Sequence, residues 1–213
     1  MGHGPSGQLV SKSTHHPKTE KMEMFRRTKN GGVSVWLPPG EATLLRTLVV
    51  PVLDLLGETS RPGPETPAGA DDLDRLLAEA VEAAEAAEAP QIPDDPVLAR
   101  LLPDAYQDDP DAAGEFRKYT ESSLREAKKY FAQTLLDTLP PSGGRVRLTG
   151  DQARDWMRAL NDVRLMFGVR LEVTEDFEEQ LAALAPDDPK VAAFEVYGWL
   201  GAVQESLVRA LDR

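Results

Sequence analysis

Cysteine is absent from the 213-residue sequence, and histidine occurs only at His3, His15 and His16. Without cysteine the chain has no disulfide, no thiolate nucleophile and no cysteine-ligated zinc site, and an unstapled chain of this size fits a reducing compartment. Because every histidine lies near the N-terminus, Ser-His-Asp catalysis is not expected in the remainder of the chain. Any metal site there would have to be built from carboxylates.

Long apolar runs are also missing. The longest apolar region, residues 44–56, is too short and too polar to span a bilayer, and no signal-peptide pattern is present. We therefore expect a soluble, cytoplasmic protein without membrane contact. The formal charge is −12, and the first 29 residues hold six Lys/Arg against two Glu, so the remainder carries −16. Such an acidic body should repel nucleic acid and anionic membranes.

Two segments have compositions that do not favour a packed core. Residues 1–24 are rich in Gly, Ser and Lys, lack a hydrophobic period and are predicted to form a disordered basic extension. Residues about 58–92 are strongly acidic and predict a flexible linker followed by a solvated Ala/Glu helix. The remaining sequence, 25–213, is predicted to form a single α-rich domain that contains this linker.

Three Asp-Pro pairs predict where helices begin, because Asp is a favoured N-cap and Pro is tolerated at the first helical position. They are Asp95-Pro96, Asp109-Pro110 and Asp188-Pro189. The predicted helices cover about 96–102, 110–138 and 189–212. The middle helix carries an apolar stripe that is expected to face the core. The stripe consists of Phe116, Thr120, Leu124, Ala127, Phe131 and Leu135.

Two short segments, residues 31–37 and 143–148, alternate apolar and polar residues and predict strands. An amphipathic helix follows each strand, and these helices are expected to end near Gly57 and Gly168. Pro51 is predicted to kink or interrupt the first of them.

The two strand-helix units resemble each other at an offset of 111 residues, which places Gly32 over Gly143 and Val35 over Val146. If the strands pair, the chain contains two pseudo-repeated halves around a small β ribbon, which needs helices packed on it to be stable. We therefore predict a mainly α, bundle-like domain with a small two-stranded β ribbon.

Familiar nucleotide and metal motifs are missing. Gly143-Gly144 is not followed by the Lys-Ser/Thr of a phosphate-binding loop, and no G-x-G-x-x-G or G-x-S-x-G pattern occurs. The acidic cluster of Asp104, Asp108, Asp109 and Asp111 lacks the ligand spacing and terminal Glu of an EF-hand, so helix capping and solubility explain it better. No cofactor and no metal ion are predicted.

A group of polar residues borders the apolar faces of two helices and is the best candidate for a site. It consists of Arg158, Asn161, Asp162, Arg164 and Gln204. One interpretation is a pocket or partner surface, and the other is a hydrogen-bond network that holds two helices in register. No catalytic residue is assigned, and the sequence favours the structural interpretation.

Three segments resemble actinobacterial proteins of domain-of-unknown-function family 2017. They are 93–106 (PDDPVLARLLPDAY), 158–165 (RALNDVRL) and 199–207 (WLGAVQESL). The Gly-Gly strand-helix units fit the same family, so the resemblance covers about residues 25–212. It implies a small, non-enzymatic, cytosolic protein with a regulatory role that is linked to regulated proteolysis.

Together these features predict a non-enzymatic regulatory or adaptor-type module that binds another protein. A transcriptional regulator is one alternative, although the acidic body makes nucleic acid an unexpected partner. A small-ligand binder or carboxylate-dependent enzyme is another alternative and requires the polar residues to share one cavity. A protein partner is expected, and a homodimer stays open.

Overall fold

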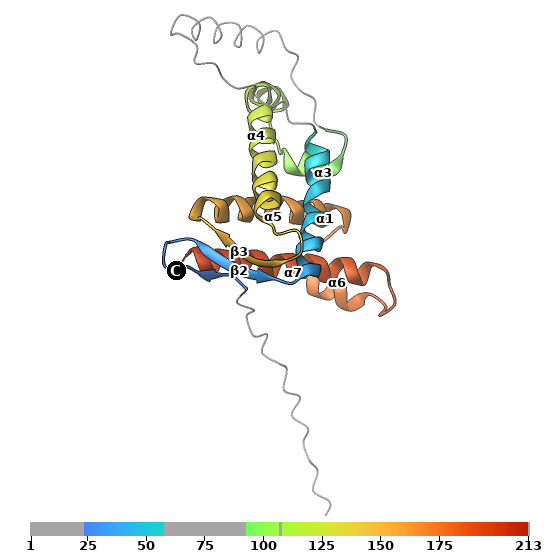
Figure 1. The fold of residues 1–213 in the computed structure, drawn as a ribbon. Helices are drawn as coiled ribbons and strands as arrows, with labels where there is room; N and C mark the ends of the chain where they lie inside the picture. Colours follow the sequence, from blue (N-terminus) through green and yellow to red (C-terminus); the bar gives the residue numbers. More distant parts are fainter. Residues whose placement is uncertain (1–23, 58–92, 107, 213) are drawn as a thin grey trace, which may run out of the picture.

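The structure is a computed structural model that describes residues 24–57, 93–106 and 108–212 (Figure 1). The elements follow the chain as β1 (Arg26–Arg27), β2 (Val33–Leu37), α1 (Pro39–Leu56), α3 (Pro96–Leu101), α4 (Pro110–Thr138), β3 (Gly144–Leu148), α5 (Gly150–Arg170), α6 (Phe177–Ala183) and α7 (Lys190–Leu211). The predicted mainly α class is confirmed. The acidic linker predicted at about 58–92 lies outside the described residues, as does all but the last residue of the extension predicted at 1–24.

The three strands form one antiparallel sheet in the order β1-β2-β3. Val35 of β2 lies opposite Val146 of β3, so the predicted pairing of these strands is confirmed. The prediction of a two-stranded ribbon is wrong in one respect, because β1 adds a third strand in which Arg26 lies opposite Ser34. Two residues are too few to produce an alternating pattern in the sequence.

The register of β2 and β3 is that of two strands related by a local twofold axis beside Val35 and Val146. The helices that follow them begin at Pro39 and Gly150, which are again 111 residues apart. Buried positions of α1 and α5 also correspond at this offset: Ala42 with Ala153, Leu45 with Trp156, Leu48 with Ala159, Val49 with Leu160, and Val52 with Val163. The two strand-helix units are therefore structural counterparts.

Two glycines at equivalent positions allow the units to approach closely. A Cβ on Gly32 would overlap the carbonyl oxygen of Leu148, and a Cβ on Gly143 would lie 2.6 Å from the backbone nitrogen of Pro39. Gly143 also adopts a φ of +73°, which residues with a side chain rarely do. Each glycine of one unit thus rests against the backbone where the strand of the other unit ends.

Helix α5 lies at the centre of the packing, with α3, α4 and α7 against it and α1 against both α4 and α5. In Figure 1, α1 and α4 stand across α5, while α7 runs along the sheet. Trp156 of α5 is fully buried, and its indole N–H donates to the hydroxyl of Thr138 at 2.7 Å. Within the described residues, no helix combines the length and apolar character needed to cross a bilayer.

The predicted caps hold at two of the three Asp-Pro pairs. The carboxylate of Asp95 accepts from two backbone N–H groups of α3, and that of Asp109 accepts from the first turn of α4. At the third pair the prediction is wrong by one residue, because Pro189 occupies the capping position. Asp188 still accepts from the N–H of Lys190 at 2.8 Å, so it ties the chain to the start of α7.

Pro51 does not interrupt α1, which continues through it from Pro39 to Leu56. Val49 and Val52, on either side of the proline, are buried, and this packing holds the helix together despite the missing N–H. Met24, which the sequence assigned to the extension, belongs to the fold, because its N–H donates to the hydroxyl of Ser206 at 2.9 Å.

Two other helix predictions need correction. Helix α5 passes Gly168 and ends at Arg170, where the backbone N–H of Leu171 caps it. Helix α6 was not predicted, because its 7 residues are too few to give a sustained apolar period, and none of them is buried. It is held by ring contacts, since Phe177 stacks on Phe194 at 5.8 Å.

Candidate functional site

The five polar residues predicted from the sequence lie on separate sides of α5 rather than in one cluster. Two of them face α4. Asp162 is buried, and its Oδ1 lies 2.6 Å from Nζ of Lys128 on α4. Arg158 places its guanidinium 4.8 Å from the ring centroid of Phe131, also on α4, and pairs with Asp155 at 3.3 Å. The Asp162–Lys128 and Arg158–Phe131 contacts join α5 to α4.

Two others join α5 to α7. Arg164 donates to the side-chain oxygen of Gln204 at 2.8 Å, and the Gln204 amide donates onward to the carbonyl of Met157 at 3.4 Å. The guanidinium of Arg164 also lies 5.2 Å from the ring centroid of Tyr197. This arrangement is the inter-helix hydrogen-bond network of the structural interpretation.

Asn161 is the remaining member, and its side chain is exposed. It lines a pocket of about 440 Å³ together with Arg100, Arg164 and Tyr197. The pocket therefore contains only two of the five predicted residues. Asp162, buried on the α4 side, does not line it, so its carboxylate and Asn161 do not act on a common ligand there.

Burial has an electrostatic effect on the α4 side. Desolvation raises the pKa of the Asp162 carboxyl, and the hydrogen bond and positive charge of Lys128 offset part of this rise. Burial of the carboxylate and its attraction to the ammonium group therefore act on the stability of the ion pair in opposite directions.

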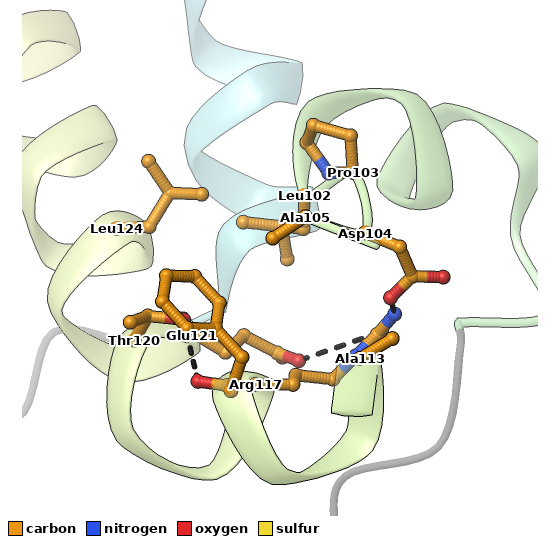
Figure 2. Close-up of a pocket in the computed structure, with 10 residues that line it drawn as sticks. Leu102, Pro103, Asp104, Ala105, Ala113, Arg117, Thr120, Glu121 and Leu124 are labelled. Carbon is orange, nitrogen blue, oxygen red and sulfur yellow. Dashed lines mark hydrogen bonds and ion pairs between the residues drawn. The ribbon is translucent and has the colours of Figure 1, made fainter. Parts of the chain in front are cut away.

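A second candidate site lies where the chain turns from α3 into α4. There two carboxylates of the acidic loop are engaged with α4. Asp104 pairs with Arg117 of α4, and Asp109 caps α4. Between the loop and the helix lies a pocket of about 210 Å³ with largely apolar walls (Figure 2). The apolar lining comes from Leu102, Pro103, Ala105, Ala113, Phe116 and Leu124.

Charged residues close one side of this α3–α4 pocket. Arg117 is only 6% exposed and lies between Asp104 and Glu121 (Figure 2). Glu121 also accepts from Arg125 at 2.6 Å, and Arg125 donates to the backbone carbonyl of Leu56 at 3.3 Å. This chain of contacts fixes the loop, α4 and the end of α1 relative to one another, so the pocket has a rigid wall.

The rim of the α3–α4 pocket is aromatic. Tyr106 from the loop meets Phe116 edge to face, with ring centroids 6.0 Å apart. Their exposed fractions are 50% and 46%, and Tyr119 on the same helix is 54% exposed. Large aromatic side chains with this much exposure are typical of a surface that binds a partner.

Sequence reasoning missed this site because it assigned the whole α4 stripe to the core. Leu135 is buried, whereas Phe116 and Leu124 are exposed. The reason is visible in Figure 1, where the N-terminal half of α4 rises beyond α5. The sequence carried one signal of this exposure. Arg117 directly follows Phe116 and Arg125 directly follows Leu124, so a charged residue lies next to each of these apolar positions.

Comparison with known proteins agrees with the resemblance seen in the sequence. The chain is 40% identical over 186 residues to the putative oxidative stress regulator AosR of Mycobacterium leprae, covering 81% of this chain and 79% of that protein. It is 37% identical over 188 residues to the oxidative stress regulator AosR of Mycobacterium tuberculosis strain H37Rv, covering 82% and 80%. The same values hold for the protein of that name from Mycobacterium bovis.

No solved structure matches the chain. A family model described as domain of unknown function, DUF2017, matches residues 22–211, which include every helix and strand described above. The chain therefore belongs to the DUF2017 family.

Proposed function

We propose that this protein is a non-enzymatic regulator of the response to oxidative stress and that it acts by binding another protein through the α3–α4 pocket. The observation that carries the proposal is the exposed Tyr106–Phe116 pair beside an apolar pocket with a rigid wall. The names of the mycobacterial relatives support the regulatory part.

The chemistry of the α3–α4 pocket favours a particular partner. Its volume of about 210 Å³ suits one large apolar side chain. Exposed carboxylates lie in the adjoining loop and the first turns of α4, at Asp108, Asp109, Asp111 and Glu115. We therefore expect the partner to insert a Leu, Met or aromatic side chain that is flanked by Lys or Arg. Arg117 in the wall is already ion-paired with Asp104 and Glu121, which favours binding over chemistry.

The absence of cysteine bears on how such a regulator would work. Thiol oxidation is a common way to sense oxidants, and it requires a reactive cysteine that these 213 residues do not contain. We infer that the oxidant signal is sensed by the partner or an upstream protein. The regulator would then respond through the amount or state of the partner that it binds.

The test combines survival with in-cell crosslinking. A photo-crosslinking amino acid at position 116 is expected to capture one defined protein in the native host, and the same amino acid at Tyr130 is the control. Tyr130 is 62% exposed on the same helix but does not line the pocket. In a strain that lacks the gene, wild type and Tyr130→Ala should restore survival under peroxide, whereas Phe116→Asp should not.

Circular dichroism and thermal unfolding of Phe116→Asp check that the variant folds. Because Phe116 is 46% exposed, the change should leave the fold intact. If the folded variant restores survival fully, or if positions 116 and 130 capture the same proteins, the α3–α4 pocket is not the binding site.

A further inference from the structure

The solvent face of the sheet combines arginine with tryptophan. The inward residues of β2 and β3, such as Val35 and Val146, are buried. The outward residues alternate with them and are Arg26, Ser34, Trp36, Arg145 and Arg147. We call these five residues the arginine face.

The strand register fixes how these side chains lie. Ser34 is the middle of one row across the sheet, with Arg26 opposite it on one side and Arg147 on the other. Neighbouring strands are about 4.8 Å apart, so the two arginines rise about 10 Å from each other at the backbone. The short side chain of Ser34 leaves the space between them open. An anionic group placed there meets two guanidinium groups and a hydroxyl.

The next row places Trp36 directly opposite Arg145. Side chains that face each other in this way have Cβ atoms about 5 Å apart, so the pair forms one continuous surface. Trp36 is 60% exposed, whereas Trp156 is fully buried. An indole held at the surface by a rigid strand offers an apolar contact next to the cationic row, and tryptophan and arginine are enriched among the residues that dominate binding.

The side chains of Arg26, Arg145 and Arg147 form no hydrogen bond or ion pair with a described residue. The strands and their flanking turns, residues 24–40 and 138–150, also contain no Asp or Glu. This contrasts with the net charge of −12 of the chain, and several other arginines have a carboxylate partner. Arg154, for example, pairs with Asp151 just beyond β3. The positive charge of the arginine face is therefore uncompensated locally.

We propose that the arginine face binds an acidic protein segment that carries an apolar side chain beside its carboxylates. The carboxylates fit the Arg26–Ser34–Arg147 row, and the apolar side chain packs on Trp36. A short segment experiences mainly the local charge, because interactions between exposed charges are screened within about 8–10 Å. A long nucleic acid would extend past the face and meet the acidic remainder of the protein, which disfavours it.

This surface is distinct from the α3–α4 pocket, and its chemistry is opposite. Exposed carboxylates lie near that pocket, which suits a basic partner, whereas the arginine face suits an acidic one. The protein would then join two partners, or two parts of one partner. Failure of one surface leaves the other standing, provided that each is tested with its own variants.

The experiment follows intrinsic tryptophan fluorescence of the full chain during titration with an alternating glutamate–leucine peptide. Trp36 is the most exposed of the three tryptophans, because Trp156 is buried and Trp199 is half-buried. Binding is expected to change the emission of wild type and to weaken as salt is added. In the variant Trp36→Phe the fluorescence change should largely disappear.

Affinity is then compared among charge-reversal variants by calorimetry. The double variant Arg145→Glu with Arg147→Glu should bind the glutamate–leucine peptide at least about tenfold more weakly than wild type. The matched control is Arg170→Glu, which changes an exposed arginine at the other end of α5, about 30 Å away. This control and the pocket variant Phe116→Asp should bind as wild type does. All these positions are exposed, so the variants should fold.

Three results would overturn the proposal. One is equal peptide affinity for the double variant and the Arg170→Glu control. Another is equal affinity for a glutamine–leucine peptide, which would mean that charge plays no part. The third is tight binding of oligothymidylate that is lost in the double variant, without binding of the acidic peptide. That result would assign the face to single-stranded nucleic acid and revive direct contact with nucleic acid.

Discussion

Nζ of Lys128 lies 2.6 Å from Oδ1 of Asp162, and this ion pair joins the middle of α4 to the middle of α5. The lysine side chain is 14% exposed and the aspartate side chain only 4%. The pair lies where α4 leaves the core. On the C-terminal side of Lys128, Leu135 is buried, and on its N-terminal side, Leu124 is exposed at the α3–α4 pocket.

The first prediction concerns the pH dependence of this pair. Desolvation raises the pKa of Asp162 above its ordinary value of 3.8, although Lys128 offsets part of the rise. A carboxyl with a higher pKa in the folded than in the unfolded protein binds its proton more tightly when folded. Its contribution to stability is therefore complete below the unfolded pKa and is lost as the pH rises through the folded pKa.

We therefore expect the free energy of unfolding of wild type, minus that of Asp162→Asn, to fall as the pH is raised from below 3.8 through the folded pKa. Urea unfolding at a series of pH values measures this difference. A difference that grows with pH over the same range would mean that Lys128 outweighs desolvation.

The second prediction concerns the buried indole of Trp156. Its N–H donates to the hydroxyl of Thr138, and Thr138→Val removes that acceptor while keeping the shape of the side chain. A buried donor without a partner costs about 1–3 kcal/mol, so the variant should be destabilised by that amount. The control is Thr47→Val, because the Thr47 hydroxyl donates only to the exposed carbonyl of Thr43. If both variants lose the same stability in urea unfolding, the indole hydrogen bond of Trp156 contributes no more to stability than the exposed hydrogen bond of Thr47.

The third prediction concerns the close approach at Gly143. Alanine there would place a Cβ 2.6 Å from the nitrogen of Pro39, in a backbone conformation with φ +73°. Strain of the left-handed conformation and overpacking together should cost about 2–4 kcal/mol. Gly40→Ala is the control, since its added Cβ meets no atom within 4 Å and lies in the first turn of α1. Thermal unfolding should show a large drop for the first variant and little change for the second.

The fourth prediction concerns Pro51. A proline inside a helix lacks the N–H for one hydrogen bond and clashes with the preceding turn, so Pro51→Ala should stabilise the protein, by up to about 3 kcal/mol. Pro39→Ala is the matched control, because proline at the first helical position loses no bond. A Pro51→Ala variant that is no more stable than wild type would indicate that the packing around the proline depends on its ring.

Local chemistry explains which features could be predicted from the sequence. Asp95 and Asp109 act through hydrogen bonds to residues two or three positions away, so their role as caps is visible in the sequence. The pairing of β2 with β3 was also predictable, because Val35 and Val146 belong to alternating segments that recur at a fixed offset. Signals of this kind need no knowledge of the tertiary structure.

The candidate sites depended on distant contacts and were less predictable. Arg158 and Gln204 were grouped because both lie at the margins of apolar helical faces. In the structure Arg158 contacts α4, whereas Gln204 lies at the α5–α7 interface. The exposure of Phe116 depends on how far α4 extends past α5, which no local pattern states. The arginine face was not predicted, because its rows of residues are defined only by the register of three strands.

The reciprocal contacts of Gly32 and Gly143 also indicate how the protein should behave if the chain is cut between the two strand-helix units. The backbone that receives Gly32 belongs to the second strand-helix unit, and the backbone that receives Gly143 belongs to the first. Neither unit contains the surface that completes its own strand, so a fragment ending after α1 or one beginning at β3 should not fold alone. Produced together, the two fragments of a chain cut between the units should assemble into one domain, as two interlocking pieces do.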